Sequence, residues 1–129
     1  MALVRVFTSF DYDHDDDLRV LLIGQSRHPD TPFTLADWSV KDHLTGDWKA
    51  KVRDRISRVD EVCVICGTHT HTAQGVAAEV EIARSLGKPY FLLKGRRDLP
   101  CTKPSTALLT DKIYNWTWEN LKILINGGR

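Results

Sequence analysis

Two glutamates in one predicted helix lie on different sides of it. Residues 74–86 have the apolar spacing of an amphipathic helix, and Gly87 is its expected C-terminal stop. At about 100° per residue, Glu79 falls within the apolar arc of this helix and Glu81 falls on the opposite, solvated side. A carboxylate on an apolar face is costly to bury unless it has a hydrogen-bond partner or a chemical role. The pattern leaves both explanations of Glu79 open.

A cluster of acids follows the first predicted strand, around His14. Clustered carboxylates suit a hard cation such as Mg²⁺ or Ca²⁺, but this spacing lacks the central glycine and final glutamate of a calcium loop. Acids also favour the positively polarised start of a helix. We therefore interpret the cluster as a helix start beside a solvated loop. Its members are Asp11, Asp13, Asp15, Asp16 and Asp17.

The histidines and cysteines do not predict a metal site. His69 and His71 lie close together in a predicted loop, but no third ligand accompanies them, which favours a hydrogen-bonding or merely exposed role. Cys63 and Cys66 have C-x-x-C spacing within a predicted strand, where side chains three residues apart point to opposite faces. We expect both cysteines to be core residues. The whole chain has three cysteines, and this odd number argues against a disulfide framework.

Several motifs of nucleotide enzymes and hydrolases are missing from the sequence. No G-x-G-x-x-G or P-loop follows the first predicted strand, and no G-x-S-x-G is present. Aromatic residues give a different hint, because a flat side chain beside a crevice can stack on a base or a nicotinamide ring. Trp38, directly after the second predicted strand, is a candidate for such stacking, whereas the spacing of Trp48 favours the core.

Short apolar runs alternate with amphipathic runs, which is typical of a parallel sheet covered on both faces. We expect a single α/β domain over residues 1–129, with a flavodoxin-like, doubly wound sheet of about five parallel strands. Asp47 and Thr117 are the expected N-caps of two of its helices. Ligands of such sheets bind beyond the carboxyl ends of the strands. The expected strands are 3–10, 33–37, 61–67, 89–94 and 112–116, and the expected helices are 15–25, 47–59, 74–86 and 118–125.

Composition excludes several classes of partner. The 129 residues carry a formal net charge of +1, whereas nucleic-acid-binding proteins usually have a clear basic excess. No apolar stretch approaches the roughly 20 residues of a membrane span, and residues 1–10 lack the pattern of a signal peptide. We therefore expect a cytoplasmic protein that binds neither nucleic acid nor membranes.

Together, these segments resemble a Toll/interleukin receptor (TIR) domain, and in particular the stand-alone bacterial TIR-like proteins of Thoeris antiphage defence. The resemblance rests on the order and spacing of several short motifs over nearly the whole chain. They are 6–10 (VFTSF), 35–40 (LADWSV), 46–48 (GDW) with Ile56, 62–68 (VCVICGT), Glu79 with Ala83, and 87–89 (GKP).

The resemblance implies an enzyme that consumes nicotinamide adenine dinucleotide (NAD) and makes an ADP-ribose-derived signalling nucleotide. Glu79 matches the family's catalytic glutamate. A lone carboxylate suits this reaction, because positively charged nicotinamide is already a good leaving group and the ribose develops oxocarbenium character. NAD is then the substrate and no cofactor is implied, while the implied protein partners are a second copy, another TIR-containing protein or an effector. By the resemblance, the dinucleotide pocket is lined by Ser9, Phe10, Asp11, Asp37, Trp38 and Thr68.

One departure and three alternatives accompany this interpretation. The family often has tryptophan four residues before the glutamate, where this chain has Gly75. A non-catalytic TIR-like interaction module would instead bury Glu79 in a core hydrogen bond with no adjacent cavity. A nucleoside deoxyribosyltransferase-like enzyme also has a helix glutamate and breaks an N-glycosidic bond. A phospho-receiver would need an aspartate at the end of the third strand, where Gly67 and Thr68 stand.

Overall fold

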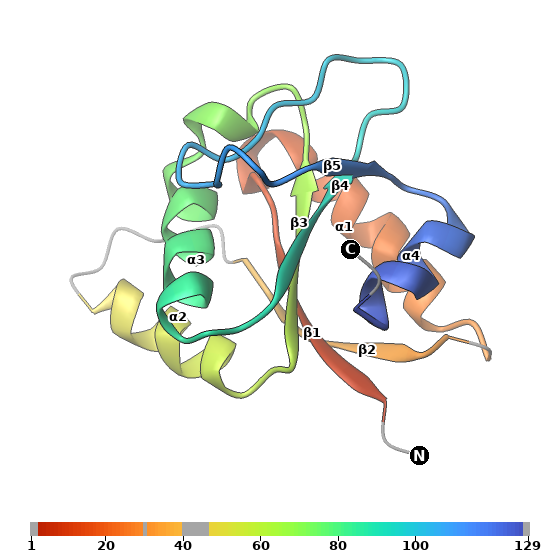
Figure 1. Ribbon diagram of the computed structural model, residues 1–129, viewed down its shortest axis with the longest axis horizontal. Coiled ribbons are helices and arrows are strands. Elements are labelled where there is room, and N and C mark those ends of the chain that lie inside the picture. The colour runs from red at the N-terminus through yellow and green to blue at the C-terminus, as the bar shows by residue number, and fades with distance from the viewer. Residues whose placement is uncertain (1–2, 30, 40–46, 128–129) are drawn as a thin grey trace.

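The computed structural model describes residues 3–29, 31–39 and 47–127. Five parallel strands form one sheet in the order β2-β1-β3-β4-β5 (Figure 1). The chain builds outward from β1 to one edge and then continues from β3 to the other, which confirms the predicted doubly wound sheet. The strands are β1 (Val4–Ser9), β2 (Phe33–Trp38), β3 (Glu61–Cys66), β4 (Tyr90–Lys94) and β5 (Ile113–Asn115).

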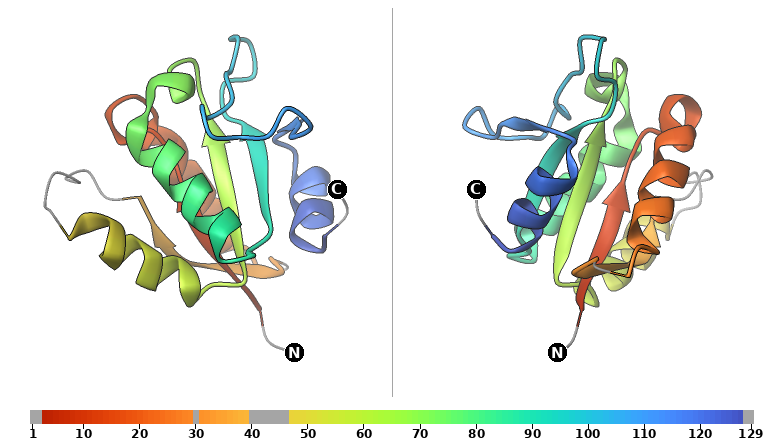
Figure 2. Two further views of the ribbon diagram at one scale, coloured as in Figure 1. Left: turned by 60° about the vertical axis from the view of Figure 1, so that its left-hand side comes forward. Right: turned by 90° about the vertical axis from the view of Figure 1, so that its right-hand side faces the viewer.

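Helices cover both faces of the sheet (Figure 2). α1 (Tyr12–Ser26) and α4 (Trp118–Ile125) pack on one face, and α2 (Trp48–Ser57) and α3 (Gln74–Ser85) pack on the other. Each face has its own core, because alternate residues of a strand point to opposite sides.

The two cysteines of β3 show this alternation. Cys63 belongs to the core beneath α1 and α4, and Cys66 belongs to the core beneath α2 and α3. Burial raises the pKa of the Cys66 thiol, so it stays protonated and packs as an apolar group. The prediction that both cysteines are core residues on opposite faces is confirmed.

The helix boundaries follow most of the predicted signals. Thr117 caps α4, accepting a 3.1 Å hydrogen bond from the backbone N–H of Asn120, and Gly87 follows α3 with a φ of +68°. Asp47 occupies the N-cap position of α2, but within the described part of the chain its side chain makes no capping hydrogen bond. Its carboxylate lies 3.3 Å from Lys51 Nζ instead. The predicted position of this helix start is therefore confirmed, but the predicted capping role of Asp47 is wrong.

The acidic start of α1 is less solvated than its sequence indicates. The helix begins at Tyr12, three residues earlier than predicted, and Asp11 caps it by accepting a 3.2 Å hydrogen bond from Asp13 N. Asp15, where the predicted helix begins, has non-helical φ/ψ within α1 and is only 2% exposed. Its Oδ1 accepts a 3.2 Å hydrogen bond from Arg96 Nη2, which offsets part of the desolvation cost.

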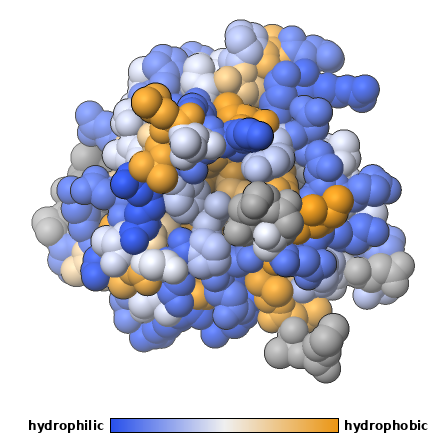
Figure 3. Space-filling view, viewed as in Figure 1, coloured by the Kyte–Doolittle hydropathy of each residue, from blue (hydrophilic) through white to orange (hydrophobic). Residues whose placement is uncertain are grey.

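The surface carries separate apolar groups. On the face seen in Figure 3, hydrophobic residues lie in several patches separated by hydrophilic ones. Leu109 is the most exposed of the large hydrophobic residues in the described part of the chain. No helix among the described residues is long and apolar enough to cross a membrane.

The contact between Gly67 and Asp15 generates the first testable prediction. A Cβ atom at residue 67 would lie 2.3 Å from Asp15 Oδ2, and that buried carboxylate has little space to move. We expect Gly67→Ala to lower the free energy of unfolding by about 1–3 kcal/mol, the usual cost of overpacking. Urea denaturation of the full chain would measure this change.

Gly24, within α1, provides the matched control. A Cβ atom there would meet no other heavy atom of the described chain within 4 Å. We expect Gly24→Ala to raise the free energy of unfolding by about 0.5–1 kcal/mol through helix propensity. Equal stability of the two variants would contradict the close approach of Gly67 to Asp15.

Candidate active site

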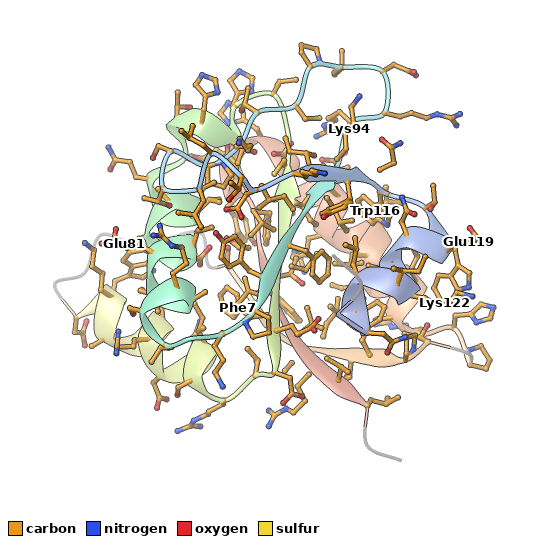
Figure 4. The ribbon with its side chains drawn as sticks, viewed as in Figure 1. Phe7, Glu81, Lys94, Trp116, Glu119 and Lys122 are labelled. Carbon is orange, nitrogen blue, oxygen red and sulfur yellow. The ribbon has the colours of Figure 1, made fainter. Side chains whose placement is uncertain are left out.

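The buried carboxylate of Glu79 is the centre of the site. Glu79 lies on the side of α3 that faces the sheet and is 1% exposed, in line with the buried Val76, Val80 and Ala83. Glu81 is exposed and lies on the outer side of α3 (Figure 4). The predicted division of the helix into a buried and a solvated side is confirmed.

Two serine hydroxyls donate hydrogen bonds to one oxygen of Glu79. Ser9 Oγ lies 2.6 Å from Glu79 Oε1, and Ser39 Oγ lies 2.5 Å from the same atom. Ser39 is itself positioned by the backbone, because its hydroxyl accepts a 3.1 Å hydrogen bond from Phe10 N and its N–H donates to Thr8 O at 2.9 Å. The two hydroxyls come from the carboxyl ends of β1 and β2, so the sheet edge fixes the position of the carboxylate.

Glu79 also lines a cavity of about 220 Å³. This volume is below the 300–1,000 Å³ typical of sites that enclose a whole ligand. The cavity opens between the start of α1, the start of α2 and the turn that leads into α3. Its lining residues are Phe10, Asp11, Tyr12, Asp13, His14, Ser39, Trp48, Thr72, Ala73, Gln74, Gly75, Val76 and Glu79.

The structure brings together four of the predicted site residues. Phe10, Asp11 and Glu79 line the cavity, and Ser9 donates a hydrogen bond to Glu79. Gly75, which stands where the family often has tryptophan, lines the cavity as well. The missing side chain therefore leaves space in the cavity itself.

Two other predicted residues, Trp38 and Thr68, lie away from this cavity. The indole of Trp38 packs against the core beneath α1 and α4, where the Arg19 guanidinium lies 5.4 Å from the ring centroid. Thr68 is half-buried after β3, and its hydroxyl lies 3.0 Å from His69 Nδ1. The side chain of Asp37 lies outside the described part of the structure, although its backbone pairs with Phe7 in the sheet.

Three residues that line the cavity were not predicted as site residues: Ser39, His14 and Gln74. Ser39 follows β2 directly, so the rule that ligands meet the carboxyl ends of strands could have identified it. His14 was hidden within the acidic cluster, and Gln74 opens α3 without a distinctive motif. Trp48 has both roles, since it packs in the core as predicted and lines the cavity.

His14 connects two loops at the mouth of the cavity. Its Nδ1 lies 2.7 Å from Asp11 Oδ2, and its ring stacks on His69 with centroids 4.0 Å apart. His71 Nδ1 lies 2.9 Å from Thr102 Oγ1. The predicted hydrogen-bonding role of His69 and His71 is confirmed. Among the described residues, no group of three or more His, Cys, Asp or Glu side chains could hold a metal ion.

Arg96 ties the segment after β4 to the start of α1. Its guanidinium donates to both carboxylate oxygens of Asp17, at 2.7 and 2.8 Å, and to the buried Oδ1 of Asp15 at 3.2 Å. Burial raises the pKa of Asp15 above its ordinary 3.8 in spite of Arg96. The same guanidinium lowers the pKa of Asp17, which is largely solvated.

These opposite shifts predict opposite pH dependences. A folded chain that holds a proton more tightly than the unfolded chain loses stability as the pH rises, and a folded chain that holds it less tightly loses stability as the pH falls. We therefore expect Asp15→Asn to gain stability relative to the natural chain as the pH rises above about 4. The destabilisation caused by Asp17→Asn should instead disappear as the pH falls below about 4, and it should stay below about 1 kcal/mol because the pair is exposed.

Urea denaturation in steps from about pH 3 to about pH 7 would measure both trends. The natural chain, measured in parallel, removes the contribution of all other titrating groups. The same sign of pH dependence in both variants would contradict the assigned shifts.

Comparison with known proteins places this geometry in a family. The sequence model for the family described as "Thoeris protein ThsB, TIR-like domain" matches residues 7–96, which is more than half of the chain. The matched segment contains the last three residues of β1, all of β2, β3, β4 and α3, and with them both serines and Glu79. No curated protein matches the chain. The chain belongs to the TIR-like domain family of the Thoeris protein ThsB.

Proposed function

We propose that this chain cleaves the bond between nicotinamide and ribose in NAD, with Glu79 as its catalytic residue. The product is an ADP-ribose-derived signalling nucleotide that acts in bacterial antiphage defence. The observation that carries the proposal is a buried carboxylate, held by two hydroxyls, in the wall of a cavity at the carboxyl ends of β1 and β2. Membership of a Thoeris family supports the setting in antiphage defence.

The reaction requires little from the protein beyond a negative charge held close to the ribose. As the C–N bond breaks, its electron pair moves to the nicotinamide nitrogen, so the leaving group departs neutral and needs no acid. The ribose carbon develops positive charge, which a carboxylate in a water-poor cavity stabilises strongly. Ser9 and Ser39 orient this carboxylate before substrate binds. Water or a hydroxyl group of an acceptor then bonds to the ribose carbon through an oxygen lone pair, and the proton of that O–H is released to solvent.

The remaining contacts in the proposal follow from the cavity. Phe10, Asp11 and the space at Gly75 surround the nicotinamide and its ribose, since the cavity volume suits that end of the molecule. Thr68 and Asp37 are kept as contacts for the part of NAD that extends beyond the cavity. Trp38 packs on the other face of the sheet, so its contact would require a ligand that reaches around the end of β2.

The protein needs no cofactor in this proposal, because NAD itself is consumed. We also propose that it works in the cytoplasm through a second copy of itself, another TIR-containing protein or an effector. These partners follow from the family resemblance alone.

A non-catalytic interaction module is the second candidate, and one observation favours it. One oxygen of Glu79 accepts two buried hydrogen bonds, as a purely structural carboxylate would. The adjacent cavity distinguishes the candidates, because the structural role predicts none. The family match also favours a TIR-like activity over a nucleoside deoxyribosyltransferase-like one.

Nicotinamide release from NAD tests the proposal. We expect Glu79→Gln to lower the rate at least about 100-fold, because glutamine keeps the size and the acceptor oxygen but removes the charge. Glu81→Gln, on the exposed side of the same helix, makes the same chemical change and should leave the rate unaltered. The reaction is followed by chromatography, with and without lysate from phage-infected cells.

Two outcomes would contradict the proposal. Equal rates for the natural chain and Glu79→Gln would exclude Glu79 as the catalytic residue. Absence of nicotinamide release under both conditions, from a chain that still binds a TIR-containing partner, would support the interaction module.

A further inference from the structure

A second and larger cavity lies on the other face of the sheet. Its volume is about 680 Å³, within the 300–1,000 Å³ typical of small-molecule sites. It sits beyond the carboxyl ends of β4 and β5, beside α1 and the start of α4, and shares no lining residue with the cavity at Glu79. Its lining includes Gln25, Lys94, Arg97, Asp98, Asn115 and Trp116.

Trp116 gives this cavity a fixed aromatic wall. Its Nε1–H donates a 2.7 Å hydrogen bond to Gln25 Oε1, and the ring packs against the core beneath α1 and α4. The indole is half-buried, so part of it stays accessible in the cavity. An indole held in this way offers a surface on which a nucleobase can stack without loss of side-chain freedom.

Two cations accompany the ring. Within the described part of the chain, the Lys94 ammonium and the Arg97 guanidinium have neither an ion pair nor a hydrogen bond, whereas Arg96 between them in sequence is bound to Asp15 and Asp17. Lys94 is the last residue of β4 and Trp116 directly follows β5, at the same end of the sheet (Figure 4). One lysine and one arginine without acidic partners suit a phosphate group.

The polar residues of the cavity narrow the class of ligand. Among the described residues of the lining, Asp98 is the only one with a carboxylate, so cations outnumber acids there. A carboxylate beside two cations disfavours a simple polyanion and suits the hydroxyl groups of a sugar, as does the nearby amide of Asn115. Ring, sugar and phosphate together describe a nucleotide.

We propose that this cavity is a second binding site, for a nucleoside phosphate. The base stacks on Trp116, the phosphate lies at Lys94 and Arg97, and the sugar hydroxyls face Asp98 and Asn115. The site is separate from the catalytic proposal, since none of these residues contacts Glu79 or the cavity around it.

Nuclear magnetic resonance titration of the full ¹⁵N-labelled chain tests the site. The probes are ADP, adenosine and inorganic phosphate, and the signal is the indole N–H of Trp116, assigned from its absence in Trp116→Phe. We expect ADP to shift this resonance in a saturable manner. Adenosine and phosphate should each bind at least about 10-fold more weakly, because each lacks one half of the recognised group.

Charge-reversal variants locate the phosphate. Lys94→Glu with Arg97→Glu should weaken ADP binding at least about 10-fold. The matched control, Arg27→Glu with Lys88→Glu, makes the same change in net charge at the α1–β2 and α3–β4 connections and should leave affinity within about 2-fold. Circular dichroism of each variant checks that the chain is folded.

Four results would overturn the proposal. The first is a Trp116 resonance that does not shift when ADP is added. Equal weakening of ADP binding in both double variants would show that overall charge, and not these two positions, determines the affinity. Phosphate binding as tightly as ADP would exclude recognition of the base. Loss of ADP binding in Glu79→Gln alone, with Lys94→Glu/Arg97→Glu unaffected, would place the nucleotide in the other cavity and would leave the catalytic proposal intact.

Discussion

The burial of one carboxylate constrains the whole edge of the sheet. An ionised acid removed from water requires hydrogen bonds that replace its hydration. Ser9 and Ser39 supply them, and each comes from a strand end that the parallel sheet holds in register. The position of α3 over the sheet, the approach of β1 to β2 and the backbone bonds of Ser39 must therefore all agree for Glu79 to be buried without a large penalty.

Most of the fold follows from apolar periodicity. The alternation of strands and helices and the division of α3 into two sides were predictable, because burial on two faces leaves a strong pattern in a strand or helix. The start of α1 was not predictable in the same way. The non-helical Asp15 within it is stabilised by Arg96, which lies 81 residues further along the chain, and no local pattern reports such a contact.

The residues of the candidate site differ in the same way: local sequence predicts some of them, and others depend on distant contacts. Glu79 was predictable from a helical wheel, since its side of the helix depends on its neighbours alone. Ser39 and His14 depend on how three separate loops meet, which spacing does not encode. The sequence did not determine the orientation of Trp38, because a residue at the end of a strand can turn to either face. Here Trp38 packs beneath α1. The structure also adds a cavity at Trp116 that no sequence motif indicates.

The distances along the chain between the groups of the site determine when it can form during folding. Ser9 and Glu79 are separated by 70 residues, Ser39 and Glu79 by 40, and Asp17 and Arg96 by 79. Contacts of such high contact order form after local helices and pay loop-closure entropy before they stabilise anything. A nascent chain that ends before α3 contains both serines but not Glu79, whose carboxylate accepts their hydrogen bonds. The hydrogen bonds to Glu79 thus form late in folding, because they require β1, β2 and α3 to have come together.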